Sequence, residues 1–428
     1  MNLLTAENLS KSFNTDKILF DNISLGINEG DKIGLIGING TGKSTLLKIL
    51  AGEEEADSGK LTKGNAVRIA YLPQNPEFDE GESVISEVIK GKKAKNEFWD
   101  TEGEARSLLA KFEIEDVEAK VATLSGGQKK RAALVRTLLD DAEILILDEP
   151  TNHLDTAMSE WLEDYLKKMK QALLIITHDR YFLDQVTNRI VELTHGKLYS
   201  YVGGYMKYLE LKAEREEMEI ATERKNAALF KKDLAWMMRG ARARSTKQKA
   251  HIERFEELKN RDKIVVDKEI VVDSVSSRLG KQIIEIENIS KAYGDKTLFA
   301  DFTYSFRRID RIGIIGKNGS GKSTLLKTIL GEVAPDSGNI IIGQTAKIGY
   351  FSQDSGELDP SQTVIESAKD IAEYVQTKDG TISASKILER FLFEGAMQYT
   401  KIEKLSGGER RRLALLHTCL LYTSPSPR

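Results

Sequence analysis

The stretch "GINGTGKS", residues 37–44, fits the pattern G-x-x-x-x-G-K-[ST] of a phosphate-binding loop. The apolar run "KIGLI" precedes it and "STLLKIL" continues from it, which predicts a strand, a glycine-rich turn and a helix in that order. Glycines let the backbone curl so that its N–H groups point at phosphate oxygens, and the positive end of the following helix adds to the attraction. We expect Lys43 to reach the β- and γ-phosphates of a nucleotide and Ser44 to bind Mg²⁺.

Three segments of the sequence occur twice, in the same order each time: "IGLIGINGTGKSTLLKIL" (33–50) and "IGIIGKNGSGKSTLLKTI" (312–329), "IAYLPQ" (69–74) and "IGYFSQ" (348–353), "LSGGQ" (124–128) and "LSGGE" (405–409). The copies are offset by 279 residues at the first two segments and by 281 at the third. Chance matches would not stay in register, so the sequence predicts a duplicated domain. A glycine turn that binds nothing is the alternative for each loop, and the double occurrence argues against it.

Short apolar runs end at polar residues within the first copy. "KIGLIG" precedes the glycine loop, "EILIL" precedes Asp148, and "ALLIIT" precedes His178. None of these runs alternates between apolar and polar residues, which is typical of strands buried on both faces of a parallel sheet. Functional residues of such sheets lie at the carboxyl ends of the strands. We predict an α/β fold for both copies.

Residues 205–281 contain none of the repeated segments. They are rich in Glu and Lys, lack proline, and hold a single glycine, Gly240, before Gly280. This composition predicts two long helices that form a hairpin, each about 45 Å long for about 30 residues. The predicted regions are therefore a first domain over 1–204, a helical linker over 205–281 and a second domain over 282–428.

The overall composition excludes several classes of protein. With 63 basic and 66 acidic side chains, the chain has no general attraction to nucleic acid, so any such attraction must be local. The single cysteine, Cys419, excludes a disulfide framework and fits a reducing compartment. The N-terminus lacks a signal-peptide pattern, and no apolar run approaches the roughly 20 residues that span a bilayer. We expect a cytoplasmic protein.

Two acids and a histidine follow predicted strands of the first copy. "ILILDEP" supplies Asp148 and Glu149, and "ITHDRYFLD" supplies His178. We expect Asp148 to hold Mg²⁺ through water, Glu149 to polarise the attacking water and His178 to sense or stabilise the γ-phosphate. An acid pair at a strand end is often only a helix cap, and a lone histidine is often structural. The phosphate loop upstream and the position at parallel strand ends favour the catalytic interpretation.

Both copies resemble ATP-binding cassette (ABC) ATPase domains. "LSGGQ" and "LSGGE" resemble the signature of that family, and "TNHLD" with Asp155 resembles its D-loop. Gln74 and Gln353 match the Q-loop, which implies contact with the metal and, for Gln74, a catalytic role. Phe13 and Tyr293 fall where the family stacks an aromatic ring on adenine, although a core aromatic after a strand is the alternative.

The resemblance implies ATP and Mg²⁺ as ligands of both copies. The implied ATP-binding residues are Phe13, Gly37, Asn39, Gly40, Thr41, Gly42, Lys43, Ser44, Thr45, Asp148, Tyr293, Gly316, Asn318, Gly319, Ser320, Gly321, Lys322, Ser323, Thr324 and Gln353. The implied metal-binding residues are Ser44, Gln74, Asp148, Ser323 and Gln353. The signature residues are Ser125, Gly126, Gly127, Gln128, Ser406, Gly407, Gly408 and Glu409. In this family two cassettes bind head to tail, so each ATP is held by the phosphate loop of one and the signature of the other.

Two cassettes without a membrane span, "DEPTNHLD", "THDRYFLD" and a charged helical linker together resemble the ABC-F subfamily. The linker text "LAWMMRGARARSTKQKAHIERFEEL" resembles that of its Uup-like branch. The resemblance implies a cytosolic ATPase that engages the ribosome and its tRNA, in translation or in the rescue of stalled ribosomes. The alternative is an ATP-dependent DNA-binding protein of the Uup type that acts in DNA repair or transposon excision.

A basic segment lies at the predicted tip of the linker. It contains Arg239, Arg242, Arg244, Lys247 and Lys249 and no acid, whereas 210–223 holds six Glu against Lys212 and Arg215. A solvated helix face normally intersperses the two signs, so this sorting favours contact with phosphates. The resemblance supplies tRNA on the ribosome as the target. Phosphate contacts alone do not distinguish RNA from DNA.

The second copy departs from the pattern near its end. At an offset of 281, the counterpart of "ILIL" is "PSPR" (425–428), and proline does not belong in a central strand. We therefore expect a second domain that is truncated before its acids, with residues after about 420 foreign to the fold. The first ATP site then has all of its parts, while the loop at Gly316–Ser323 is expected at most to bind nucleotide.

Three other functions share some of these features. A transporter motor needs a membrane partner and has no use for a basic helical hairpin. A chromosome-structural ATPase places its phosphate loop and signature at opposite ends of one long coiled coil, whereas each copy here contains both. A non-enzymatic ATP-gated binding module has no need of Glu149.

Overall fold

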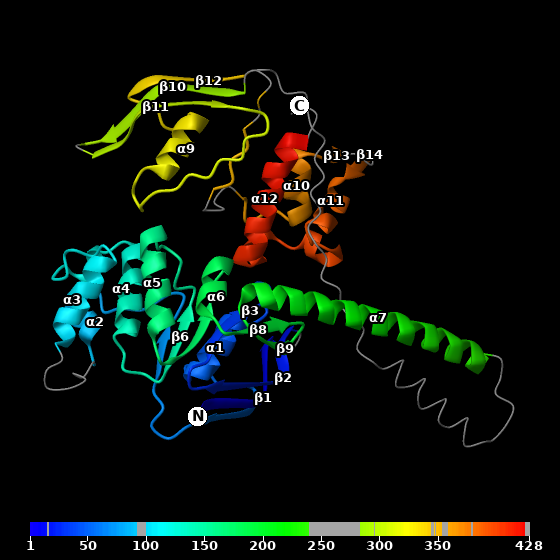
Figure 1. Ribbon diagram of the computed structural model, residues 1–428. Helices are drawn as coiled ribbons and strands as arrows, with labels where there is room; N and C mark the ends of the chain where they lie inside the picture. The colour runs from blue at the N-terminus through cyan, green and yellow to red at the C-terminus, as the bar shows by residue number, and fades with distance from the viewer. Residues whose placement is uncertain are drawn as a thin grey trace, which may run out of the picture. The chain divides into compact units, whose positions relative to one another are not determined.

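The computed structural model describes residues 1–14, 17–91, 100–238, 283–294, 296–343, 346, 348–352, 358–377 and 380–423 (Figure 1). The chain divides into two units, Met1–Val265 and Val266–Arg428. Both this division and the boundary predicted at 281 fall within 239–282, outside the described residues.

A six-stranded sheet in the order β5-β6-β7-β3-β8-β9 forms the centre of the first unit. Its strands are β3 (Lys32–Ile36), β5 (Ile69–Leu72), β6 (Ile144–Asp148), β7 (Ala172–Ile176), β8 (Arg189–Thr194) and β9 (Lys197–Val202). The first five strands in the order are parallel, and β9 is antiparallel to β8. The three runs predicted as strands are β3, β6 and β7, and they are neighbours. The prediction of a parallel α/β sheet is confirmed.

This sheet is buried on both faces. Along β6, Ile144 and Ile146 belong to one apolar core, and Leu145 and Leu147 belong to another. The first core lies against α1 (Lys43–Ala51) and a second, antiparallel sheet, β2-β1-β4. The strands of that sheet are β1 (Asn2–Asn14), β2 (Lys17–Asn28) and β4 (Ser58–Lys63). Burial on both faces explains why the sequence of each central strand is apolar without alternation.

Helices on the other face of the sheet carry the signature segment. They are α2 (Val84–Ile89), α3 (Thr101–Lys111), α4 (Gly126–Leu138), α5 (Thr156–Lys168) and α6 (Arg180–Val186), with a short 3₁₀ turn at Val121–Thr123. Figure 1 shows α2 and α3 at the edge of the unit, beyond α4 and α5. Phe112, just after α3, meets the ring of Trp161 on α5 edge to face, with the ring centres 5.4 Å apart. This contact belongs to the core that joins the α2–α3 lobe to the sheet.

A single long helix, α7 (Tyr205–Met238), follows β9. Its 34 residues correspond to a length of about 50 Å. Figure 1 shows α7 leaving the side of the unit near β9. The first of the two predicted linker helices is therefore present, while the return helix and the basic tip lie outside the described residues.

The second unit repeats the antiparallel sheet and the helical lobe. Its elements are β10 (Ile284–Tyr293), β11 (Lys296–Phe306), α9 (Lys322–Leu330), β12 (Ser337–Ile342), α10 (Val364–Ile371), β13 (Tyr374–Thr377), β14 (Gly380–Ser383), α11 (Ala384–Arg390), two 3₁₀ turns at Gly395–Tyr399 and Ile402–Lys404, and α12 (Gly407–Thr423). The sheet order β11-β10-β12 matches β2-β1-β4 of the first unit.

The strand expected before the second phosphate loop is not formed. Ile312 and Ile315 are 48% and 85% exposed, and residues 311–317 have no regular structure. In the first unit the equivalent strand, β3, is held between β7 and β8, which follow the signature helix in the chain. Among the described residues of the second unit no strand follows α12, so this segment has no parallel neighbour.

Candidate active site

The first phosphate loop connects β3 to α1. Gly42 precedes the helix with φ 93°, a left-handed conformation that glycine adopts without strain. Gly37 passes so close to β8 that an added Cβ would collide with the carbonyl oxygen of Leu193. Backbone geometry therefore requires glycine at the first and sixth positions of the motif.

Lys43 is the first residue of α1, and its ammonium group lies inside the curl of the loop. Its Nζ donates to the carbonyl oxygens of Gly37 (2.7 Å) and Ile38 (3.0 Å). Burial lowers the pKa of Lys43, and the charges of Glu149 and Asp148 oppose this shift. The residues between the loop glycines close a tight turn, in which Thr41 Oγ1 donates to the carbonyl of Ile38 (2.9 Å). Thr45 follows on α1.

Asp148 ends β6 and is buried, with 3% of its surface exposed. Burial raises its pKa, while a hydrogen bond from Ser44 and the charge of Lys43 lower it. Its Oδ2 has no hydrogen-bond partner among the described residues. An unpaired buried carboxylate oxygen beside a serine hydroxyl fits a hard cation such as Mg²⁺, which prefers oxygen ligands.

Mg²⁺ takes most of its ligands from phosphates and water when it binds a nucleotide. The described residues contain no group of three or more His, Cys, Asp or Glu side chains placed to hold a metal. The donor set of one carboxylate and one hydroxyl fits such an ion. It does not resemble the cage of a structural metal.

Glu149 follows Asp148 in a left-handed turn with φ 55°. Its backbone N–H donates to the carbonyl of Ile176 on β7 (2.8 Å), which fixes this turn against the neighbouring strand. Its Oε2 accepts from the backbone N–H of His178 (3.4 Å), and its Oε1 lies 3.4 Å from His178 Nε2. Burial raises the pKa of Glu149 to about 7. A carboxylate with this pKa is suited to accept a proton near neutral pH.

His178 lies at the exposed edge of the same site. Burial, followed by the charge of Lys43, lowers its pKa. At neutral pH the imidazole is therefore uncharged, and it is able to donate or accept a hydrogen bond. The structure brings His178 together with Glu149 and Lys43, three residues that the sequence separates widely.

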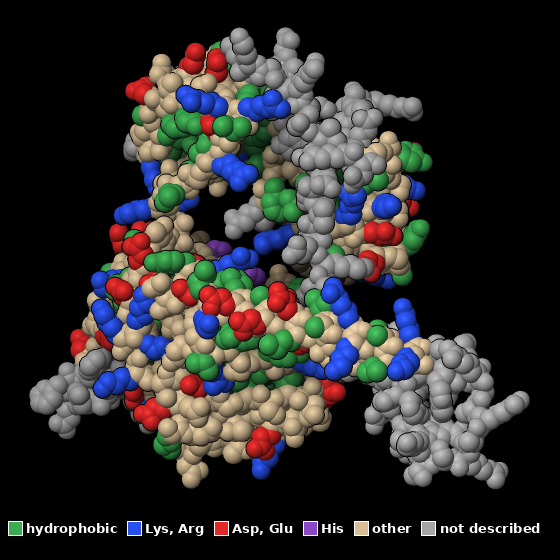
Figure 2. All heavy atoms as spheres, turned by 45° about the vertical axis from the view of Figure 1, so that its right-hand side comes forward, with side chains coloured by type: hydrophobic (Ala, Val, Ile, Leu, Met, Phe, Trp, Pro, Cys, Tyr) green, Lys and Arg blue, Asp and Glu red, His purple; other side chains and the backbone are tan. Residues whose placement is uncertain are grey.

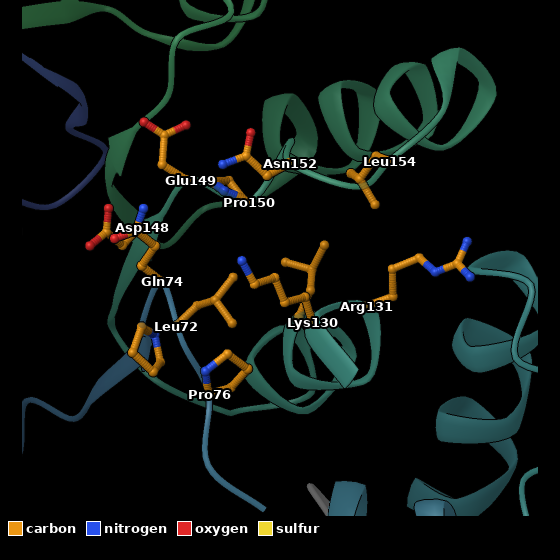
Figure 3. A pocket seen from close by; sticks show the side chains of 12 residues that line it. Leu72, Gln74, Pro76, Lys130, Arg131, Asp148, Glu149, Pro150, Asn152 and Leu154 are labelled. Carbon is orange, nitrogen blue, oxygen red and sulfur yellow. The ribbon is translucent and has the colours of Figure 1, made fainter. Parts of the chain in front are cut away.

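Gln74 lies beside these acids. It follows β5 and lines a pocket with Asp148, Glu149, Lys130 and Asn152 (Figure 3). Figure 3 shows Asp148 and Glu149 on one side of the pocket, with Gln74 near Asp148. The Q-loop glutamine is thus next to the carboxylate that fits the metal.

The sequence did not indicate Lys130 or a hydroxyl pair near the acids. Lys130, on α4, lines the pocket through its side chain. Thr151 Oγ1 and Thr177 Oγ1 are 2.6 Å apart and join the turn after β6 to the turn after β7. Both threonines closely follow the ends of neighbouring strands, which is the signal that would have found them.

Each signature segment forms the N-terminus of a helix. Ser125 Oγ accepts from the backbone N–H of Gln128 (3.3 Å), and Gln128 Oε1 accepts from the N–H of Ser125 (2.9 Å). Ser406 and Glu409 make the same reciprocal pair, at 3.4 and 2.7 Å. The first and fourth residues of the sequence S-G-G-[QE] therefore act as a capping box. Gly126, Gly127, Gly407 and Gly408 form the first turns of α4 and α12.

The second phosphate loop keeps the local geometry of the first. Lys322 Nζ donates to the carbonyls of Gly316 and Lys317, both at 2.7 Å. Gly321 precedes α9 with φ 96°, and the remaining predicted loop residues lie in the turn or on α9: Asn318, Gly319, Ser320, Ser323 and Thr324. No acid equivalent to Asp148 or Glu149 is among the described residues of this unit.

The other predicted residues are placed less completely. Phe13 lies near the end of β1, and its side chain is outside the described part of the chain. Tyr293 ends β10, is 56% exposed, and has Lys291 Nζ 5.5 Å from its ring centre. Gln353 and the five basic residues of the tip fall outside the described residues.

Comparison with known proteins agrees with this site. A family model described as "ABC transporter" matches residues 20–152 and 299–424, and a second with the same description matches 191–272. The chain therefore belongs to the ABC transporter family of ATP-binding proteins, and it is an ATP hydrolase with two cassettes. None of the helices that the structure describes has the length and apolar character needed to cross a membrane.

Two curated relatives and one solved structure illustrate the likeness. The chain is 45% identical over 457 residues to the "Uncharacterized ABC transporter ATP-binding protein YfmR" of Bacillus subtilis (strain 168), covering 98% of this chain and 72% of that protein. It is 36% identical over 436 residues to the "Energy-dependent translational throttle protein EttA" of Escherichia coli (strain K12), covering 93% of this chain and 78% of that protein. A solved ATP-binding subunit of an ABC transporter is 24% identical to this chain, with a TM-score of 0.42. The match covers 47% of this chain and 90% of the solved chain.

Proposed function

We propose that the first cassette hydrolyses ATP with Glu149 as the base that takes a proton from the attacking water. The pKa of about 7 at Glu149 carries this assignment, because the group then accepts a proton readily at neutral pH. Lys43 and the loop N–H groups hold the phosphates, and His178 orients Glu149 and the γ-phosphate. Ser44 and Asp148, with Gln74 nearby, would hold Mg²⁺, which would supply neutralisation of the charge on the phosphates.

We further propose that the chain is an ABC-F ATPase that couples ATP to engagement of the ribosome in the cytoplasm. The likeness to EttA, a translational throttle protein by its name, supports this function. The resemblance of the charged linker to those of ABC-F proteins extends it to contact with tRNA. Completion of each ATP site by the signature of the other cassette stays a prediction of the family resemblance.

The charge distribution along α7 supports an arm that reaches toward phosphates. The half nearest the sheet carries exposed glutamates, whereas exposed Arg224, Lys225, Lys231 and Lys232 lie farther along the helix. Figure 2 shows Lys and Arg side chains gathered along the far part of this helix. The basic segment that follows in the sequence continues the same trend. An arm with a basic end attracts a polyanion at that end only.

The tip charges provide the test. Replacing Arg239, Arg242, Arg244, Lys247 and Lys249 together with Ala should weaken binding to tRNA-loaded ribosomes. The slope of log affinity against log salt should flatten by about 0.7–0.9 for each phosphate that the tip no longer neutralises. A matched control replaces five exposed basic residues of the first unit: Lys60, Lys63, Lys120, Lys167 and Lys168. ATPase activity without ribosomes should not change in either variant.

Two outcomes would count against the proposal. An unchanged ribosome affinity and salt slope in the tip variant would remove the RNA-binding role of the tip. If the parent chain prefers double-stranded DNA to tRNA-loaded ribosomes at one salt concentration, the alternative of a DNA-binding ATPase replaces the ribosomal function.

A further inference from the structure

Glu192 on β8 is a buried carboxylate outside the ATP site, with 4% of its side chain exposed. It accepts hydrogen bonds from the hydroxyls of Tyr201 (3.3 Å) and Tyr208 (3.0 Å) and from Lys212 Nζ (2.7 Å). A guanidinium nitrogen of Arg215 lies 3.2 Å from its second oxygen. Tyr208, Lys212 and Arg215 share one face of α7, at spacings of four and three residues. One carboxylate therefore ties the base of α7 to the sheet.

This cluster, which we call the Glu192 clamp (Glu192, Tyr201, Tyr208, Lys212 and Arg215), differs from a surface ion pair. The Arg215 guanidinium stacks on the ring of Tyr199 at 3.9 Å. Burial, followed by the charge of Glu192, raises the pKa of both Tyr201 and Tyr208, so both hydroxyls stay protonated donors. Four groups converge on the Glu192 carboxylate, whereas Arg215 Nε and Nη1 have no hydrogen-bond partner among the described residues. A buried carboxylate with several donors holds one geometry more strictly than an exposed ion pair does.

The sequence contains a trace of the clamp. Lys212 and Arg215 are the two basic residues in the otherwise acidic stretch 210–223. Both point their charge at Glu192. The clamp therefore explains why these two cations interrupt the acidic part of the arm.

The backbone next to Glu192 supports the phosphate loop. Glu192 pairs with Ile36 in the parallel ladder between β3 and β8. The next residue, Leu193, presents its carbonyl oxygen to Gly37 so closely that no Cβ fits between them. Strand β8 thus touches the nucleotide loop through its backbone and the arm through the adjacent side chain.

We propose that Glu192 is a positioning residue that couples the phosphate loop to the direction of α7. The inference rests on the proposed function, in which α7 carries the contact with RNA. A shift of the loop at Gly37 acts on the end of β8, and the clamp passes that shift to the base of the arm. Because coupling between two sites is reciprocal, loosening the clamp must also change nucleotide affinity.

The test combines a distance measurement with a binding measurement on the full chain. Cys419 is replaced with Ala, and spin labels are placed at two exposed positions, Glu160→Cys on α5 and Ala228→Cys on α7. In this background, Glu192→Gln removes the negative charge at the centre of the clamp and leaves Lys212 and Arg215 in place. Glu216→Gln is the matched control, because Glu216 contacts the same Lys212 and Arg215 from the surface, with 49% of its side chain exposed.

We expect Glu192→Gln to broaden the label-to-label distance distribution at least twofold and to weaken binding of a non-hydrolysable ATP analogue about fivefold or more. Glu216→Gln should change neither. Tyr208→Phe removes one hydroxyl without changing the ring, so it should shift both readouts in the same direction by a smaller factor. This variant replaces Glu192→Gln in the test if the Glu192→Gln chain does not fold.

A parent-like value of either readout in the clamp variants would overturn the proposal. Neither measurement contains a ribosome or RNA. A parent chain that fails to bind ribosomes therefore refutes the proposed function and leaves the result on the clamp intact.

Discussion

At the scale of single residues, Glu149 and His178 occupy the turns after two neighbouring strands, and their side chains meet at 3.4 Å. Glu149 lies in a left-handed turn and lines the same pocket as Asp148, and the charge of Lys43 acts on its carboxylate. Two adjacent acids thus have different surroundings. Asp148 lies against Ser44 and Lys43, whereas Glu149 contacts His178. For this reason we propose that Asp148 binds the metal and that Glu149 transfers the proton.

Replacing Glu149 with Gln should abolish steady-state phosphate release and leave ATP binding in place, because the amide keeps the shape of the side chain and cannot act as the base. The control is Glu143→Gln, just before the opposite end of the same strand, where the carboxylate contacts Arg68 at the surface. Substantial turnover by the Glu149→Gln chain would mean that another group is the base.

The pH dependence of turnover follows from the same residue. The base must be deprotonated to work, and its pKa lies at about 7, above the ordinary value of 4.5. The rate should therefore fall about tenfold per pH unit below pH 7 and level off above it. A rate that stays flat down to pH 5 would contradict the raised pKa.

At the scale of elements, the central strands could be predicted and the contacts between segments could not. The runs ending at Gly37, Asp148 and His178 are apolar on both faces, so their burial and parallel order follow from the sequence. Residues 312–316 have the same apolar composition but form no strand. A strand also needs neighbouring strands to pair with, and the described residues of the second unit supply none for this segment. The Glu192 clamp joins residues of β8, β9 and α7. The sequence carries a trace of it in Lys212 and Arg215, the two cations of the acidic stretch 210–223, but their partner on β8 could not be predicted before the fold was known.

The helical lobes of the two units use different residues at one equivalent contact between helices. In the first unit, Arg136 on α4 contacts the buried Glu87 on α2 at 3.1 Å. The equivalent positions of the second unit hold His417 on α12 and Ser367 on α10, and His417 Nε2 is 3.0 Å from Ser367 Oγ. Burial lowers the pKa of His417, against the charge of Asp370.

This contact predicts a stability that depends on pH. The folded-state pKa of His417 lies below its unfolded value, so the neutral form is favoured by folding. The contribution is complete above the unfolded pKa of about 6.5 and is lost as the pH falls through and below that value. The hydrogen-exchange protection factors of α10 and α12, which correct for the intrinsic pH dependence of exchange, should therefore fall between pH 7 and 5 relative to those of α2 and α4. His417→Gln should remove that difference, and an equal change of the protection factors in both lobes of the parent would refute the prediction.

At the scale of the whole molecule, one unit holds both an ATP site and the base of a long arm. The phosphate loop, the acids and the clamp all belong to the first unit. The arm begins three residues after the end of β9, at Tyr205. A change at the nucleotide therefore has a short route through β8 to the helix that we propose contacts RNA.

The most direct test is co-sedimentation of the Glu149→Gln chain with ribosomes in the presence of ATP, of ADP and of neither. We predict that the affinity of the chain for ribosomes is about tenfold higher with ATP than with ADP. The ribosome-bound fraction should rise accordingly when ATP is present. Lys43→Ala, which removes the loop ammonium, should abolish that difference. Equal bound fractions under all three conditions, at a salt concentration where the chain binds measurably, would contradict the claim that ATP governs engagement of the ribosome.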